Sequence, residues 1–238
     1  MALLDTAFPW IGLVAAIPLV ALLAGNALRM DRSVARWRDW GWLSWVGVAA
    51  YLVHNVEEYG LDIHGDADAF PKAFCAMFGF PGLYPVCPVP GAVFTAVNVP
   101  LFWIAAPLGA WLAKRHPWAG LGLYGVIAVN MLAHIGRALA DGGVYNPGLL
   151  TAVAVFLPLA FWVLVGARLW TKAVVVAVVA LGLTLHGILI AGMLLLVKGV
   201  VQDAGIVALI QIGNAGLMIA LPLLAERGVR CLNRSPSA

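Results

Sequence analysis

The sequence predicts an all-helical protein, a transmembrane bundle of about seven helices that forms one domain over residues 1–238. The first observation is the composition, since 63% of the residues are hydrophobic and only 11% are charged, which excludes an ordinary soluble domain. The second is a series of apolar runs of about 20 residues, the length that a helix needs to cross a bilayer. The third is the lack of an alternating apolar pattern, so helices rather than a strand barrel must satisfy the backbone.

Seven apolar runs predict the helices, and short connections join them apart from one long loop at about residues 60–90. The runs cover residues 9–28, 40–60, 91–113, 119–139, 149–167, 173–197 and 204–224. The residues before the first run include Asp5 but no Lys or Arg. We therefore expect the first run to stay attached as a helix, because a cleavable signal peptide begins with positive charge.

The basic residues divide unevenly between the two ends of these helices. Eleven would lie on one side: Arg29, Arg32, Arg36, Arg38, Lys114, Arg115, Arg168, Lys172, Arg227, Arg230 and Arg234. Only Lys72, Arg137 and Lys198 would lie on the other side. Because basic loops stay in the cytoplasm, this split predicts an outer N-terminus and a cytoplasmic C-terminus. The net charge of +3 then belongs to loops and does not indicate a nucleic-acid partner.

The long outer loop carries two of the three cysteines, Cys75 and Cys87, whereas Cys231 lies in the predicted cytoplasmic tail. An oxidising outer compartment favours a disulfide between the two loop cysteines, and two reduced thiols are the alternative. The loop is also rich in aromatic residues, Pro and Gly. It would be either a cap that folds back over the second helix or an ordered surface loop.

The second run ends in the polar stretch His54-Asn55-Val56-Glu57-Glu58. On a helix, positions i, i+3 and i+4 share one face, so His54, Glu57 and Glu58 should converge. Titratable groups cost several kcal/mol to keep near hydrocarbon. This cost favours a chemical role for the three side chains over a packing role.

Two further histidines are predicted to lie at the same depth as His54. The second, fourth and sixth runs cross in the same direction, and His54, His134 and His186 lie about 14, 15 and 13 residues into them. Asn130 would lie one turn below His134. A lone buried His186 is more often a packing residue, and its place in the site rests on depth alone. Interhelical hydrogen bonds are the expected role of three other polar residues, Asn98, Gln211 and Asn214.

Three ordered motifs suggest a family. Residues 54–58 match HxxEE, Asn130-Met131-Leu132-Ala133-His134 matches NxxxH, and Asn146-Pro147-Gly148 supplies an NPG. Together they resemble the HXXEE-domain integral membrane proteins over about residues 40–150. The resemblance implies a multi-pass protein of the inner (cytoplasmic) membrane of a prokaryote, with enzymatic activity of no settled class. Asn146 and Pro147 also suit the start of the fifth helix, where they would form a local cap.

The first hypothesis for the chemistry is a metal-dependent hydrolase that acts on a lipid-like or amphiphilic substrate taken laterally from the bilayer. Imidazole and carboxylate suit zinc or iron, and a catalytic site needs about three protein ligands with an open position. His54, Glu58 and His134 would be these ligands. Glu57 would be the general base, and His186 would be a fourth ligand or a partner of one.

Two other hypotheses remain open from the residues. In a metal-free enzyme, such as an isomerase, a cyclase or a glutamate-type intramembrane hydrolase, Glu57 or Glu58 would donate protons. His54 and His134 would then shuttle protons, and Asn130 would hold an oxyanion or a substrate hydroxyl. A proton-coupled transporter also keeps such groups at depth, but the sequence shows no internal repeat. Di-iron and retinal proteins are disfavoured, because the chain lacks the carboxylates of the first and the final-helix lysine of the second.

Overall fold

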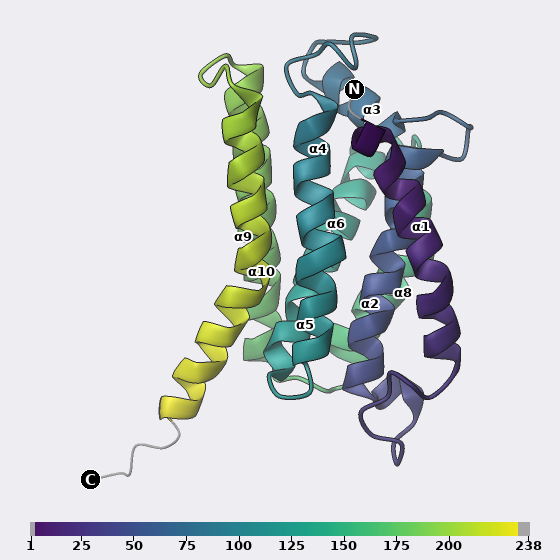
Figure 1. The fold of residues 1–238 in the computed structure, drawn as a ribbon, viewed down its shortest axis with the longest axis vertical. Coiled ribbons are helices and arrows are strands. Elements are labelled where there is room, and N and C mark those ends of the chain that lie inside the picture. The colour runs from purple at the N-terminus through teal and green to yellow at the C-terminus, as the bar shows by residue number, and fades with distance from the viewer. Residues whose placement is uncertain (1–2, 233–238) are drawn as a thin grey trace.

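The computed structural model describes the backbone of residues 3–232 and the side chains of residues 3–229. These residues form an all-helical bundle of seven long segments that run along one axis (Figure 1). The segments are α1 (Leu3–Ala24); α2 (Trp40–Asn55) with η2 (Val56–Gly60); α4 (Gly91–Asn98) with η3 (Val99–Ala105) and α5 (Ala106–Leu112); α6 (Pro117–Ala140); α7 (Leu149–Thr151) with η4 (Ala152–Phe156), α8 (Leu157–Phe161) and η5 (Trp162–Gly166); α9 (Lys172–Val197); and α10 (Ala204–Leu232). Two short helices, η1 (Arg36–Arg38) and α3 (Ala69–Met77), lie in the connections.

Six of the seven segments are long and apolar enough to cross a membrane, so the chain is a multi-pass membrane protein as predicted. The segment formed by α2 and η2 is not among the six. It covers residues 40–60 and is long enough to cross, but the polar residues at its end lower its hydropathy. The segment whose composition is least suited to lipid is therefore the one that carries the HxxEE motif.

The ends of the chain are separated in the way that an odd number of crossings requires. In Figure 1, α1 begins at the same end of the bundle as α3, and α10 ends at the opposite end, which also holds the connection from α1 to α2. This second end holds the basic connections, which agrees with the charge split, and the outer N-terminus stays a prediction. Arg234 and the side chains of Arg230 and Cys231 lie outside the described residues.

The first and last helices extend beyond their apolar runs at one end, although α1 also ends at Ala24 rather than at residue 28. α1 starts at Leu3 rather than at residue 9, because Asp5 is buried and accepts a hydrogen bond of 2.7 Å from the Thr95 hydroxyl of α4. α10 continues to Leu232 rather than to residue 224. There the buried Glu226 pairs with His116 across 3.7 Å. Each extension contains a charged residue, Asp5 or Glu226, that is buried against a partner elsewhere in the fold. Hydropathy along the sequence cannot predict such partners.

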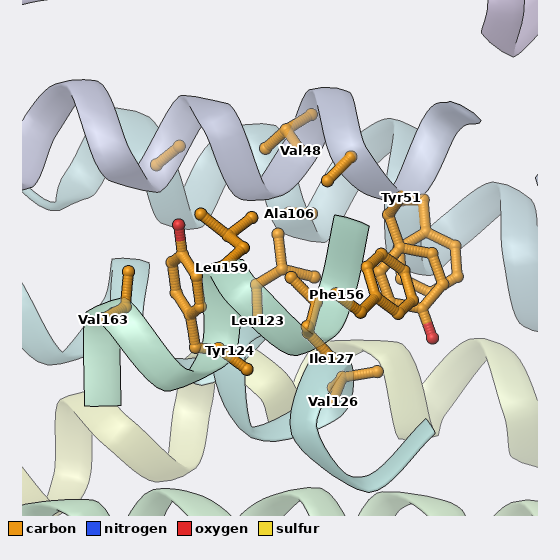
Figure 2. Close-up of a cluster of buried hydrophobic side chains, with 14 of the residues drawn as sticks. Val48, Tyr51, Ala106, Leu123, Tyr124, Val126, Ile127, Phe156, Leu159 and Val163 are labelled. Atoms are coloured by element: carbon orange, nitrogen blue, oxygen red, sulfur yellow. The ribbon is translucent and has the colours of Figure 1, made fainter. Parts of the chain in front are cut away.

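The centre of the bundle is formed by α6, which is the most buried of the spanning helices. Figure 2 shows α6 side chains packed between α2 and the fifth segment, with Tyr124 and Ile127 among Val48, Phe156 and Leu159. On its other side α6 lies directly against α9, because a Cβ on Gly125 or Gly182 would collide with the facing backbone. Small residues at such crossings let membrane helices approach closely.

The loop of residues 60–90 folds back over the bundle as a cap, which is one of the two arrangements that the sequence leaves open. Cys75 and Cys87 form a disulfide with their Cα atoms 6.2 Å apart, which confirms the favoured pairing. α3 turns an apolar face of Phe70, Phe74 and Met77 toward the interior cavity of the bundle. These residues recur every three to four positions, as one face of a helix requires.

Candidate functional site

The residues of the HxxEE and NxxxH motifs meet at one point near the end of the bundle that carries α3. Glu58 lies between two histidines, since its Oε1 is 3.1 Å from His134 Nε2 and 3.5 Å from His54 Nε2. The two imidazole rings lie at 5.3 Å between centroids. All three side chains are buried, with exposures of 0% for His54, 3% for Glu58 and 5% for His134. We call these three residues the His–Glu cluster, and their meeting confirms that the two histidines share one depth.

The expectation that His54, Glu57 and Glu58 converge holds for His54 and Glu58, whereas Glu57 has other partners. The backbone widens into a π-helical turn, η2, directly after Asn55. Adjacent side chains on a helix point in different directions, and here Glu58 contacts α6, whereas Glu57 contacts the start of the fifth segment. Single π-helical turns inside α-helices are frequent at functional sites. Glu57 is therefore not a member of the His–Glu cluster.

Glu57 holds the beginning of the fifth segment. Its carboxylate accepts hydrogen bonds from the backbone N–H groups of Leu150 and Thr151, at 2.9 and 2.7 Å, and from the Thr151 and Tyr145 hydroxyls, at 2.5 and 2.9 Å. The first N–H groups of a helix lack partners within it, and a carboxylate is favoured there. Burial raises the pKa of the Tyr145 phenol, and its bond to Glu57 adds to the shift, so this group stays a donor. The role of Glu57 as a general base stays a prediction, while its contacts are those of a helix cap.

Thr151 fixes the tautomer of His54. The Thr151 hydroxyl has one hydrogen, which it donates to Glu57, so it accepts from His54 Nδ1 at 2.6 Å. The hydrogen of the neutral His54 ring is then on Nδ1. The other nitrogen, Nε2, has no hydrogen-bond partner among the described residues and faces Glu58 with its lone pair.

Asn146 fixes His134 in the same way. Its Nδ2 donates to the His134 backbone carbonyl at 3.0 Å, which turns its Oδ1 toward His134 Nδ1 at 2.8 Å. Since that oxygen only accepts, Nδ1 carries a hydrogen, and in the neutral ring Nε2 presents its lone pair to Glu58. The sequence predicts that Asn146 caps the fifth helix. In the structure its side chain instead orients the ring of His134. Three acceptor atoms thus converge, and this arrangement needs a cation or a shared proton at its centre.

Gly148 closes the cluster from the side of the fifth segment. It adopts a φ of +95°, and a Cβ at this position would lie 2.5 Å from His134 Cε1 and 3.0 Å from His54 Cε1. Two independent reasons therefore favour glycine at position 148. Its left-handed backbone conformation disfavours other residues, and the two imidazole rings occupy the space that a side chain would need. This explains the glycine of the NPG motif.

We expect Gly148→Ala to displace both imidazole rings and to weaken any ligand that the His–Glu cluster binds. A left-handed alanine costs roughly 1–2 kcal/mol, and rings that must shift lose their bonds to Thr151 and Asn146. The measurement is metal affinity and melting temperature of the purified variant, with Gly136→Ala in α6 as the control. A Cβ on Gly136 would meet nothing within 4 Å. Unchanged metal affinity in Gly148→Ala would contradict the close packing.

A cavity of about 500 Å³ opens beside the cluster. Glu58 and His134 line it, whereas His54 and Glu57 do not. Most of its wall is apolar, from α3, η3, α6 and α9. Exposed lining residues mark where it reaches the surface of the bundle: Met77 of α3, Ala133 and Arg137 of α6, and Ile190 of α9. The cavity therefore reaches the cluster from the side of the bundle between α3, α6 and α9.

The remaining predicted site residues line this cavity without joining the cluster. Asn130 and His186 both do so. The group of possible ligand atoms within 4.8 Å of one another contains His54, Glu58 and His134 but not His186. Asn214 and Gln211 bond to α9 backbone carbonyls as predicted, and Asn98 bonds both to the Phe94 carbonyl of its own helix and to the Tyr59 side chain of η2. Sequence reasoning did not identify Thr151 or Tyr145, whose only signal is their closeness to the NPG motif.

A comparison with protein families places the site in a known sequence pattern. A model described as "Protein of unknown function with HXXEE motif" matches residues 45–163. This range contains both histidines and the glutamate of the cluster, together with Asn146, Gly148 and Thr151 around it. No curated protein and no solved structure matches the chain. The matched range is thus the part of the chain that builds the site.

Proposed function

Since the chain belongs to the family of proteins with the HXXEE motif, we propose a function from the site that this motif builds: a membrane-embedded, metal-dependent hydrolase of a lipid-like or amphiphilic substrate. His54, Glu58 and His134 bind the metal. Zinc and iron are the ions that suit two imidazoles and a carboxylate.

The observation that carries the proposal is the convergence of two fixed imidazoles on one carboxylate oxygen. Ligands at 2.0–2.1 Å from a tetrahedral ion lie about 3.3 Å apart, and the separations of 3.1 and 3.5 Å from Glu58 Oε1 are close to this value. Each histidine also donates its other N–H to a polar partner, Thr151 or Asn146. Metal-binding histidines almost always have such a partner, which fixes tautomer and ring direction.

The cavity supports the choice of substrate and reaction. A metal with three protein ligands keeps a position for water, and it lowers the pKa of that water to near neutrality. Glu58 and His134 present this position to a mostly apolar cavity, which suits the hydrocarbon chain of an amphiphile. In the proposed hydrolysis the water oxygen bonds to the acyl carbon of an ester, the bond to the alcohol breaks, and the alcohol leaves with a proton.

One observation favours a second candidate, metal-free acid–base catalysis. His134 Nε2 and Glu58 Oε1 are at hydrogen-bond distance, so a single proton between them would satisfy both. Glu58 and His134 would then donate and accept protons from the substrate in the cavity. His54 Nε2 would remain 3.5 Å from the same oxygen without a hydrogen bond, which a metal explains better.

Metal content and ester hydrolysis of the detergent-purified full chain test the proposal. We expect about one zinc or iron per chain, and release of p-nitrophenol from p-nitrophenyl dodecanoate faster than from p-nitrophenyl acetate. Chelation should abolish the release, and reloading with the same metal should restore it. Hydrolysis by wild-type protein that contains no metal would contradict the metal-dependent mechanism and favour acid–base catalysis. Metal-bound protein without hydrolysis of any acyl ester would overturn the reaction class.

A further inference from the structure

The cavity carries a second group of polar atoms, separate from the His–Glu cluster. It consists of Asn130 on α6, His186 on α9 and Asn214 on α10, all of which line the cavity. Asn130 lies one helical turn from His134, about 6 Å along α6, toward the centre of the bundle. The group thus lines the same cavity as Glu58 and His134 but lies outside the converging ligand atoms of the cluster.

Asn214 presents a hydrogen-bond acceptor whose direction is fixed by its own contacts. The side chain is buried, with 9% exposure. Its Nδ2 donates to the Leu185 carbonyl at 3.0 Å and to Gln211 Oε1 at 3.2 Å, so both amide hydrogens are used. The remaining atom, Oδ1, is buried and has no hydrogen-bond partner among the described residues.

His186 and Asn130 add acceptors to the same wall. His186 Nδ1 lies 2.8 Å from the Gly182 carbonyl, which can only accept, so Nδ1 carries the hydrogen and neutral Nε2 is an acceptor. Asn130 Oδ1 is buried and likewise lacks a partner within the described part of the chain. Unpartnered buried acceptors are rare in folded proteins, because each forfeits its hydrogen bond to water.

We propose that these acceptors bind a hydroxyl group of the substrate, so that the substrate class is an amphiphile with a hydroxyl about one helical turn from the bond that reacts. A hydroxyl fits better than an ammonium, because the group consists of neutral amide and imidazole acceptors in a mostly apolar wall, where an unpaired charge is costly to bury. The hydroxyl donates its hydrogen to one of the three acceptors, Asn130 Oδ1, Asn214 Oδ1 or His186 Nε2. That the bound molecule is a substrate rests on the proposed function. That a hydroxyl-bearing amphiphile binds in the cavity does not.

Two probes that differ only in the donor test the proposal: dodecan-1-ol and its methyl ether, 1-methoxydodecane. Their binding to the full chain is measured by native mass spectrometry after release from detergent micelles. We expect the wild type to bind the alcohol roughly tenfold more tightly than the ether, the effect of about one hydrogen bond. Asn214→Leu and Asn130→Leu should lose this preference and keep their affinity for the ether.

The second variant guards against a folding defect, since Asn214→Leu also removes bonds between α9 and α10, whereas Asn130 takes no part in them. Metal content is measured in the same samples. A preference that disappears in Asn130→Leu supports the hydroxyl site even if the wild type holds no metal, in which case only the proposed function fails. Equal binding of the two probes by a metal-loaded wild type, or a preference that is unchanged in both variants, overturns the hydroxyl site alone.

Discussion

His54→Ala and His134→Ala are expected to remove the bound metal from the purified protein, with the content falling from about one ion per chain to roughly a tenth or less. Each substitution deletes one of three ligands, and the two that remain lie on a single carboxylate and a single imidazole. The alanine methyl group also offers no ligand atom in place of the imidazole nitrogen. Because the site is buried, water replaces the lost ligand poorly. Elemental analysis of the variants, purified in parallel with the wild type, gives the result.

His186→Ala is the matched control, because His186 lies at the same predicted depth and lines the same cavity but is outside the group of converging ligand atoms. It should retain the metal. Loss of metal from His186→Ala would make it a fourth ligand and contradict the three-residue cluster. Thr151→Val provides a graded test, since removal of a residue that orients a ligand typically weakens metal binding about 10- to 100-fold.

Most of the fold could be predicted from the sequence, because the bilayer imposes a strong and simple requirement on composition and length. The predicted runs 40–60 and 173–197 agree with the observed segments within one residue. The two clear differences, at α1 and α10, arise from Asp5 and Glu226. Both residues are buried by partners far away in the sequence, and an apolar run cannot reveal such partners.

The candidate site was predictable in its location and less so in its detail. Counting residues along parallel helices correctly brought His54 and His134 to one level, since helical rise is constant. The π-helical turn η2 could not be foreseen in this way, and neither could the different partners of Glu57 and Glu58. Thr151 contributes through a hydroxyl and a backbone N–H, groups that periodicity and hydropathy do not single out.

Glu57→Leu is expected to destabilise the protein rather than to act on the chemistry directly. The substitution leaves two backbone N–H groups and two hydroxyls without their charged acceptor. We estimate a loss of about 3 kcal/mol, since bonds to charged groups contribute about 1.5–3 kcal/mol each and part of the loss is recovered by water. For a chain of this size that corresponds to a fall in melting temperature of roughly 6–12 °C, measured in detergent on metal-free protein.

The comparison with Glu58→Gln separates the two neighbouring carboxylates. Glu58 faces the two histidines and caps no helix, so Glu58→Gln should keep the melting temperature of the metal-free protein close to that of the wild type while it loses the metal. Glu57→Leu should do the reverse, with a large fall in melting temperature and a smaller, indirect effect on metal affinity through Thr151 and His54. If Glu57→Leu instead kept both its melting temperature and its metal but lost all hydrolysis, the carboxylate would be a general base and the capping role would be secondary. The adjacent glutamates of the HxxEE motif would then share one function, which their contacts on two different helices argue against.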